Sequence, residues 1–109
     1  MLTGTADEVI KNETYTDYFM HKTGHWLGLD VHDMGKYMVD GDSIILEPGM
    51  VFTVEPGIYV HSKSKAPKKY RGIGIRIEDD ILITATGNKN MTAAVPKEIM
   101  EIEALMTRV

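Results

Sequence analysis

Residues 70–80 read Tyr70-Arg71-Gly72-Ile73-Gly74-Ile75-Arg76-Ile77-Glu78-Asp79-Asp80. The three isoleucines of this run alternate with glycine and arginine. Successive side chains of a β-strand point to opposite faces, so the alternation predicts a strand with one apolar face and one polar face. The polar face carries Gly74 and Arg76 and ends at the carboxylate of Glu78.

The segments before and after this run favour further strands. An apolar run covers residues 51–54, stops at Pro56-Gly57 and resumes at residues 58–60. This pattern predicts two strand pieces around a bend. Residues 81–84 are expected to extend the sheet, and Gly87-Asn88 is expected to turn the chain.

The last segment predicts a helix that begins at Pro96, since proline suits a first helical turn. Four apolar residues follow at helical spacing, namely Ile99, Ile102, Leu105 and Met106. Residues 62–69 are rich in lysine and predict a loop. Residues 1–20 are mixed, and their aromatic group at 15–19 fits the end of a helix or the start of a strand equally well.

The composition limits the class of protein. A chain of 109 residues with 43% hydrophobic and 26% charged residues has room for one folded domain with a modest core. The absence of cysteine excludes disulfides and thiolate metal sites, so any metal must be held by histidine and carboxylates. A net charge of −4 gives no reason to expect a nucleic-acid partner, and no apolar run is long enough to cross a membrane. With no secretory leader at the start, we expect a cytoplasmic protein.

Polar residues at three places suggest one metal site. His25 lies in a histidine-rich segment, while Glu55 and Glu78 each follow a predicted strand. A carboxylate at such a place needs a cation, which can be a metal, an arginine or a histidine. One imidazole and two carboxylates suit Mn(II), Co(II) or Zn(II). Arg76 can orient a ligating carboxylate without binding the metal itself. A plain ion pair of Arg76 with Glu78 would also explain both residues.

Three blocks in this order resemble one known family. They are the segment 21–33 with its three histidines, the block 46–59 around Glu-Pro-Gly, and the run 70–80. Together they resemble the carboxy-terminal half of Xaa-Pro aminopeptidase (aminopeptidase P), a proline-specific pita-bread metallopeptidase of family M24B. Residues 86–92 and 98–106 look like the closing segment of the same family, so the resemblance covers nearly the whole chain.

The resemblance implies a fold and a reaction. The fold is α+β, the carboxy-terminal half of a pita-bread fold, with a curved antiparallel sheet and helices on its outer face. Residues 1–109 would then be the carboxy-terminal half of a peptidase M24 catalytic domain. The reaction is metal-dependent hydrolysis of the amino-terminal Xaa-Pro bond, in peptides with proline at the second position.

The resemblance also implies a ligand set. Family members hold two divalent metal ions, commonly Mn(II), with two aspartates, one histidine and two glutamates. His25 matches the histidine, Glu55 the first glutamate and Glu78 the glutamate that bridges both ions. Glu55 is also implied as the general base.

Further roles follow from the same resemblance. His21 and His32 match histidines that line the substrate site, position the proline side of the peptide and stabilise the tetrahedral intermediate. Arg76 matches an arginine that supports the ligands from behind. Lys22 stands where the family often has a small or uncharged residue, so we expect an altered wall on the substrate side.

The two aspartate ligands do not match any residues of this chain. In the family they lie upstream of the histidine and eleven positions apart, and no two aspartates of this sequence have that spacing. We therefore expect a fragment that needs its amino-terminal half, is inactive alone and leaves an apolar face that drives homo-oligomerisation. Two alternatives remain, namely a prolidase that cuts only Xaa-Pro dipeptides and a non-catalytic pita-bread binding module.

Overall fold

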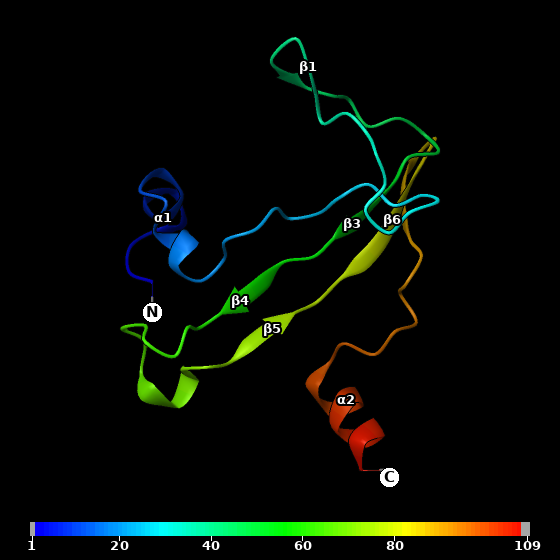
Figure 1. Ribbon diagram of the computed structural model, residues 1–109. Coiled ribbons are helices and arrows are strands. Elements are labelled where there is room, and N and C mark those ends of the chain that lie inside the picture. The colour runs from blue at the N-terminus through cyan, green and yellow to red at the C-terminus, as the bar shows by residue number, and fades with distance from the viewer. Residues whose placement is uncertain (1, 108–109) are drawn as a thin grey trace. The chain divides into compact units, whose positions relative to one another are not determined.

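The computed structural model describes residues 2–107 of the chain (Figure 1). The chain divides into two compact units, each built from two separate segments. The first unit takes Met1–Thr23 and Glu55–Ile77, and the second takes Gly24–Val54 and Glu78–Val109. All paired strands among the described residues are antiparallel, which confirms the α+β class that the sequence predicts.

The first unit begins with helix α1 (Ala6–Lys11) and the 3-10 turn η1 (Thr14–Asp17). A capping box starts α1: Glu8 Oε2 accepts from the Thr5 N–H at 2.8 Å, and Thr5 Oγ1 accepts from the Glu8 N–H at 3.3 Å. These bonds satisfy two amide groups that a helix start leaves without partners. The spacing of Thr5 and Glu8 is therefore the sequence signal for helix α1, which the aromatic group at residues 15–19 does not identify.

A hairpin of β4 (Gly57–Tyr59) and β5 (Gly74–Arg76) forms the rest of this unit. The strand predicted at residues 58–60 thus begins one residue earlier, and Val60 continues the pairing by donating its N–H to the Ile73 carbonyl at 2.8 Å. The lysine-rich loop lies between the two strands, as predicted, and contains the 3-10 turn η2 (Lys68–Tyr70).

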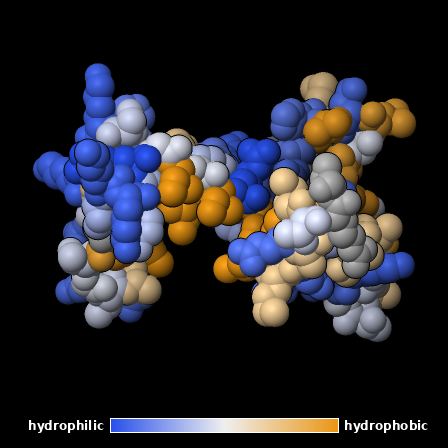
Figure 2. Space-filling model, turned by 90° about the horizontal axis from the view of Figure 1, so that it is seen from below, coloured by the Kyte–Doolittle hydropathy of each residue, from blue (hydrophilic) through white to orange (hydrophobic). Residues whose placement is uncertain are grey.

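The apolar face of β5 is not buried among the described residues. Ile75 is 63% exposed, and Ile73 and Ile77 are each 45% exposed. These side chains line an apolar groove together with Pro56, Gly57, Ile58, Val60 and Tyr70. Figure 2 shows apolar side chains at the surface beside hydrophilic ones. The buried apolar cluster of this unit is small and consists of Tyr18, Val60 and Ala66.

The second unit contains a three-stranded sheet in the order β3-β6-β7. Strand β3 (Val51–Val54) confirms the predicted apolar strand, and β6 (Asp79–Thr84) confirms the predicted extension of the sheet. Strand β7 (Gly87–Asn90) pairs with the second half of β6. The central strand is therefore β6, with β3 and β7 on its two sides.

The predicted turn at Gly87-Asn88 is wrong by two residues. Gly87 pairs with Thr84, so the turn consists of Ala85 and Thr86. The φ of Gly87 is +154°, a conformation that glycine adopts without steric cost. Gly87 is thus the first residue after the turn, where the backbone has a positive φ that favours glycine.

Two further elements belong to the second unit. Strands β1 (Met38–Val39) and β2 (Asp42–Ser43) form a small hairpin whose turn residues, Asp40 and Gly41, have φ of +52° and +93°. Two positive φ values are typical of the type I′ turn that joins tight hairpins.

Helix α2 (Ile99–Met106) begins later than predicted, with Glu98 rather than Pro96 at its boundary. The Lys97 ammonium donates to the Thr92 and Val95 carbonyls at 3.1 Å each, and these bonds hold the residues before Glu98 in a turn. None of the helices within residues 2–107 combines the length and apolar character that crossing a bilayer requires.

Candidate metal centre

Strand β3 of the second unit pairs with two distant parts of the sequence. On one side, Thr53 donates its N–H to the His25 carbonyl at 2.8 Å, and Leu27 donates to the Val51 carbonyl at 3.1 Å. On the other side, Val54 pairs with Asp79 of β6, so Glu78 immediately precedes the register partner of Val54. The residue after Val54 in the chain is Glu55. The pairing of β3 thus brings His25 and Glu78 to the end of this strand, and Glu55 follows that end in the chain.

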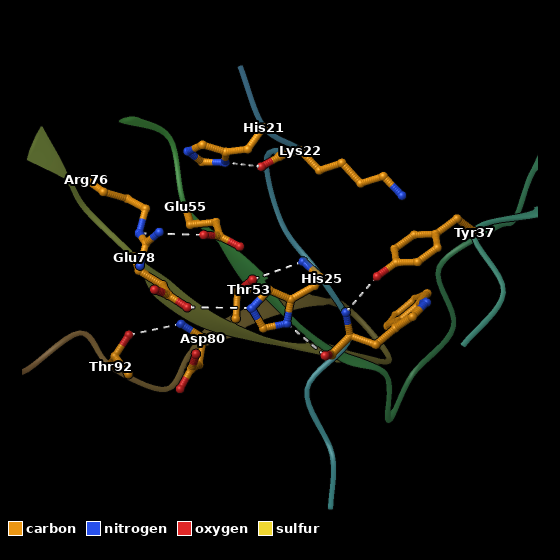
Figure 3. Close-up of polar contacts among 11 residues, drawn as sticks. His21, Lys22, His25, Tyr37, Thr53, Glu55, Arg76, Glu78, Asp80 and Thr92 are labelled. Atoms are coloured by element: carbon orange, nitrogen blue, oxygen red, sulfur yellow. Dashed lines mark hydrogen bonds and ion pairs between the residues drawn. The ribbon is translucent and has the colours of Figure 1, made fainter. Parts of the chain in front are cut away.

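The imidazole of His25 has a defined tautomer. Its Nδ1 lies 2.9 Å from the Trp26 carbonyl oxygen, which can only accept, so Nδ1 carries the hydrogen. In the neutral ring Nε2 then keeps its lone pair, as a metal-binding histidine requires. Nε2 lies 3.9 Å from Glu78 Oε1, and Figure 3 shows that carboxylate directed at the ring.

Glu55 is a buried carboxylate with a cation beside it. The residue is 8% exposed, and its Oε2 lies 3.6 Å from Arg76 Nε. Its N–H donates to the Thr23 carbonyl at 2.7 Å, which fixes the backbone at this position. Burying an unpaired carboxylate is costly, so the guanidinium offsets part of that cost. Arg76 therefore lies beside the carboxylate of Glu55.

The ligand atoms of the three residues form one group. His25, Glu55 and Glu78 each offer one nitrogen or oxygen, and these three atoms lie within 4.8 Å of one another. Two atoms that share an ion at about 2.0–2.2 Å can lie up to about 4.4 Å apart. An imidazole with a lone pair at Nε2 and two carboxylates therefore fit one divalent ion with small adjustments. No aspartate of the described residues belongs to this group.

The two other predicted histidines have different surroundings. His32 is exposed, and its ring lies edge-on to that of His25 with centroids 4.3 Å apart. His21 is half-buried, with its ring nitrogens 2.7 Å from the Lys22 carbonyl and 2.8 Å from the Tyr59 hydroxyl. The structure thus places His32 beside a candidate ligand and gives His21 a hydrogen-bonded position of its own.

Sequence reasoning missed one polar residue beneath the site. Thr53 is 2% exposed, and its hydroxyl accepts from the His25 N–H at 3.0 Å. A threonine inside the apolar run 51–54 was the available signal, because a buried hydroxyl needs a hydrogen-bond partner. Together with the backbone bond, this contact ties His25 to β3 at both its N–H and its carbonyl.

Thr53→Val is expected to destabilise the protein by about 1–3 kcal/mol, because the His25 N–H loses its hydroxyl acceptor while the shape of the side chain is kept. Thr53→Ser keeps the hydroxyl and serves as the matched control, with a smaller loss expected. Urea unfolding of the three proteins measures the difference. Equal stability of the valine variant and the wild type would contradict this role of Thr53.

A second polar cluster secures the start of β6. Asp79 Oδ1 accepts from the Thr92 hydroxyl at 2.6 Å and lies 2.9 Å from the Lys97 ammonium. The Thr92 hydroxyl oxygen in turn accepts from the Asp80 N–H at 3.1 Å. The Thr92 hydroxyl, followed by Lys97, holds the pKa of Asp79 below its ordinary value of 3.8. The cluster thus joins the residue after Glu78 to the segment that precedes α2.

This lowered pKa predicts a pH dependence of stability. The folded state holds the ionised form of Asp79 more strongly than the unfolded state does, so the contribution is complete above the ordinary pKa of 3.8. It is lost as the pH falls through the lower pKa of the folded state. We expect Asp79→Asn to lower the melting temperature at pH 6 and to have progressively less effect below pH 3.8. A difference that stays constant down to pH 2 would contradict this assignment.

Comparison with known proteins defines the class. The model of metallopeptidase family M24 matches residues 2–85. The chain belongs to metallopeptidase family M24.

Particular relatives are closely similar. The chain is 59% identical over 106 residues to the Xaa-Pro aminopeptidase of Escherichia coli K12, a match that covers 97% of this chain and 24% of that protein. The solved structure of Pseudomonas aeruginosa aminopeptidase PepP superposes with a TM-score of 0.91 at 53% identity, covering 98% of this chain and 24% of that one. The structure of zinc-substituted E. coli aminopeptidase P in complex with product gives a TM-score of 0.88 at 59% identity, with the same coverage of 98% and 24%. The chain thus spans about a quarter of the length of these relatives, and the likeness supports the pita-bread fold that the resemblance implies.

Proposed function

We propose that this chain is part of an Xaa-Pro aminopeptidase, which hydrolyses the bond between an amino-terminal residue and a following proline. The observation that carries the proposal is the group formed by the ligand atoms of His25, Glu55 and Glu78. It is supported by the 59% identity to the E. coli Xaa-Pro aminopeptidase. Peptides with proline at the second position are the proposed substrates.

We propose that His25, Glu55 and Glu78 would hold divalent metal, two ions in the complete enzyme, with Mn(II) as the metal used. When bound, two such ions lower the pKa of a shared water and polarise the scissile carbonyl. The fit of the site supports this assignment, since His25 offers a lone pair at Nε2 and both carboxylates offer hard oxygen ligands.

Other residues of the chain have proposed roles in the same reaction. Glu55, buried and beside Arg76, takes the proton of the attacking water and returns it to the leaving amine. Arg76 orients Glu55. His21 and His32 line the substrate site, where they position the proline side of the peptide and stabilise the tetrahedral intermediate.

We further propose that residues 1–109 are the carboxy-terminal half of an M24 catalytic domain. The ligand group holds three residues, and in the family pattern two aspartates complete it. The coverage of 24% of the E. coli relative supports a longer polypeptide that supplies them. The exposed isoleucines of β5 form an apolar face. This face supports either coverage by the other half of the domain or a contact between copies in a homo-oligomer.

Residues 1–109 produced alone are expected to show no measurable turnover of an Xaa-Pro tripeptide with Mn(II), because the metal site is incomplete. The full-length protein, assayed at equal molar concentration, is the positive control. Turnover of the isolated chain at the rate of the full-length protein would contradict the proposed ligand set.

A substrate comparison on the full-length protein tests the proposed function. Xaa-Pro tripeptides and longer peptides should be cleaved with Mn(II), whereas cleavage of Xaa-Pro dipeptides alone would identify a prolidase. Calorimetric titration with Mn(II) addresses the non-catalytic binding module, which predicts no metal binding. The cytoplasmic location stays a prediction that cell fractionation checks.

A further inference from the structure

His21 is held on several sides within the first unit. Its Nδ1 lies 2.7 Å from the Lys22 carbonyl oxygen and its Nε2 lies 2.8 Å from the Tyr59 hydroxyl. The ring also packs edge-on against Phe19 and Tyr59, with centroids 4.7 Å and 5.3 Å away. Both nitrogens and the ring edges thus have fixed neighbours, which leaves the imidazole one orientation.

The hydrogen bond to the Lys22 carbonyl defines the tautomer of His21. A backbone carbonyl accepts and never donates, so the bond to Lys22 requires the hydrogen on Nδ1 of His21. In the neutral ring Nε2 then has a lone pair, and the Tyr59 hydroxyl is the donor in the second bond. The Tyr59 hydroxyl thus donates a hydrogen bond to the lone pair of His21 Nε2.

The position of the Tyr59 ring depends on two glycines. A Cβ on Gly57 would lie 2.7 Å from the Tyr59 hydroxyl oxygen, and a Cβ on Gly74 would lie 3.0 Å from Tyr59 Cδ1. Gly74 is also the register partner of Tyr59 in the hairpin. The backbone of Tyr59 is fixed as well, because its N–H donates to the Tyr18 carbonyl at 2.8 Å. The ring therefore lies flat over positions where any side chain would displace it.

We infer that Tyr59 is a positioning residue: its hydroxyl, held over Gly57 and Gly74, donates to Nε2 of the Nδ1–H tautomer of His21 and holds that ring in place. The functional part of this inference rests on the proposed peptidase function. Within that function, neutral His21 presents an oriented ring to the substrate, because Lys22 and Tyr59 engage both of its nitrogens. It can donate from Nε2 only after that nitrogen has taken up a proton.

The first test is spectroscopic and uses the full-length protein labelled with ¹⁵N-histidine. The His21 signals are assigned by their loss in His21→Gln. In the wild type at pH 8 we expect a protonated Nδ1 and an unprotonated Nε2. Tyr59→Phe should shift the Nε2 signal of His21, because that nitrogen loses its hydrogen bond, and so should Gly57→Ala, which keeps the hydroxyl but moves it away. A protonated Nε2 in the wild type, or an unchanged His21 in both variants, would overturn the inference.

Tyr15→Phe is the matched control for removal of a hydroxyl. Tyr15 lies in η1 of the same unit, and its hydroxyl makes no hydrogen bond to any residue among 2–107. We expect its His21 signals and its activity to equal those of the wild type. A shift of the His21 Nε2 signal in this control as large as that in Tyr59→Phe would overturn the specific role of Tyr59.

The second test is kinetic. Tyr59→Phe should lower kcat/KM for an Xaa-Pro tripeptide by about 10- to 100-fold, the usual effect of removing a residue that orients another. The same substitution in a His21→Ala background should cost less than about twofold, because the two residues act as one unit. An undiminished cost in that background would overturn the positioning role. An inactive wild type with Mn(II) would reject the proposed function instead, while the spectra still decide the role of Tyr59.

Discussion

Glu78→Ala should lower kcat/KM of the full-length protein for an Xaa-Pro tripeptide on the order of a thousand-fold or more. The proposed role of Glu78 is to hold divalent metal, and metal ions supply several kcal/mol of transition-state stabilisation, where each 1.36 kcal/mol is tenfold. The variant should also bind Mn(II) much more weakly, since Glu78 Oε1 is one of the three grouped ligand atoms. Steady-state assays and calorimetric titration with Mn(II) measure the two effects.

Glu101→Ala is the matched control for this substitution. Glu101 lies in α2 and is exposed, so we expect wild-type activity and metal binding from it. Retained peptidase activity in Glu78→Ala would reject the assignment of Glu78 to the metal centre.

Glu55→Gln should lower kcat by about a hundred- to ten-thousand-fold, the usual contribution of a general base. The amide keeps the volume of the side chain and one oxygen, but it does not take up the proton of the attacking water. KM should change much less than kcat, because the amide leaves the substrate contacts in place. Steady-state assays at saturating Mn(II) separate these two constants.

Glu103→Gln is the control for this change, because Glu103 is an exposed carboxylate of α2. An increase in KM with an unchanged kcat would assign Glu55 to substrate binding and contradict its role as general base. Loss of the folded protein is detected by circular dichroism and is separable from loss of catalysis.

Local patterns in the sequence predicted most of the strands. The apolar run that became β3 and the alternation that became β5 both depend on neighbouring residues, so they are visible in the letters alone. The isoleucines of β5 identify an apolar face, but the pattern cannot say what covers it, and Ile75 is 63% exposed. Burial depends on groups distant in the sequence, which local periodicity does not specify.

The boundaries that were wrong depend on side-chain bonds and strained angles. Helix α2 begins after Glu98 because Lys97 binds two carbonyls before it, and a proline signal alone does not include such bonds. The turn before β7 lies at residues 85 and 86, two residues before the predicted position, because the positive φ falls on Gly87. Both differences are effects of a few local contacts.

The candidate site was predicted as three residue types, and its geometry came from strand pairing. The sequence indicated that Glu55 and Glu78 end strands, but the pairing of Thr53 with His25 and of Val54 with Asp79 joins residues far apart in the chain. Neither Thr53 nor Tyr59 was predicted as a site residue. Their hydroxyls matter because each one bonds a histidine, a contact that only the folded chain creates.

Anomalous diffraction at the manganese absorption edge, from crystals of the full-length protein grown with Mn(II), tests the metal assignment most directly. We predict an anomalous peak at coordination distance, about 2 Å, from His25 Nε2 and from a carboxylate oxygen of both Glu55 and Glu78. A peak at other residues, or none near these three side chains in a catalytically active crystal, would contradict the account.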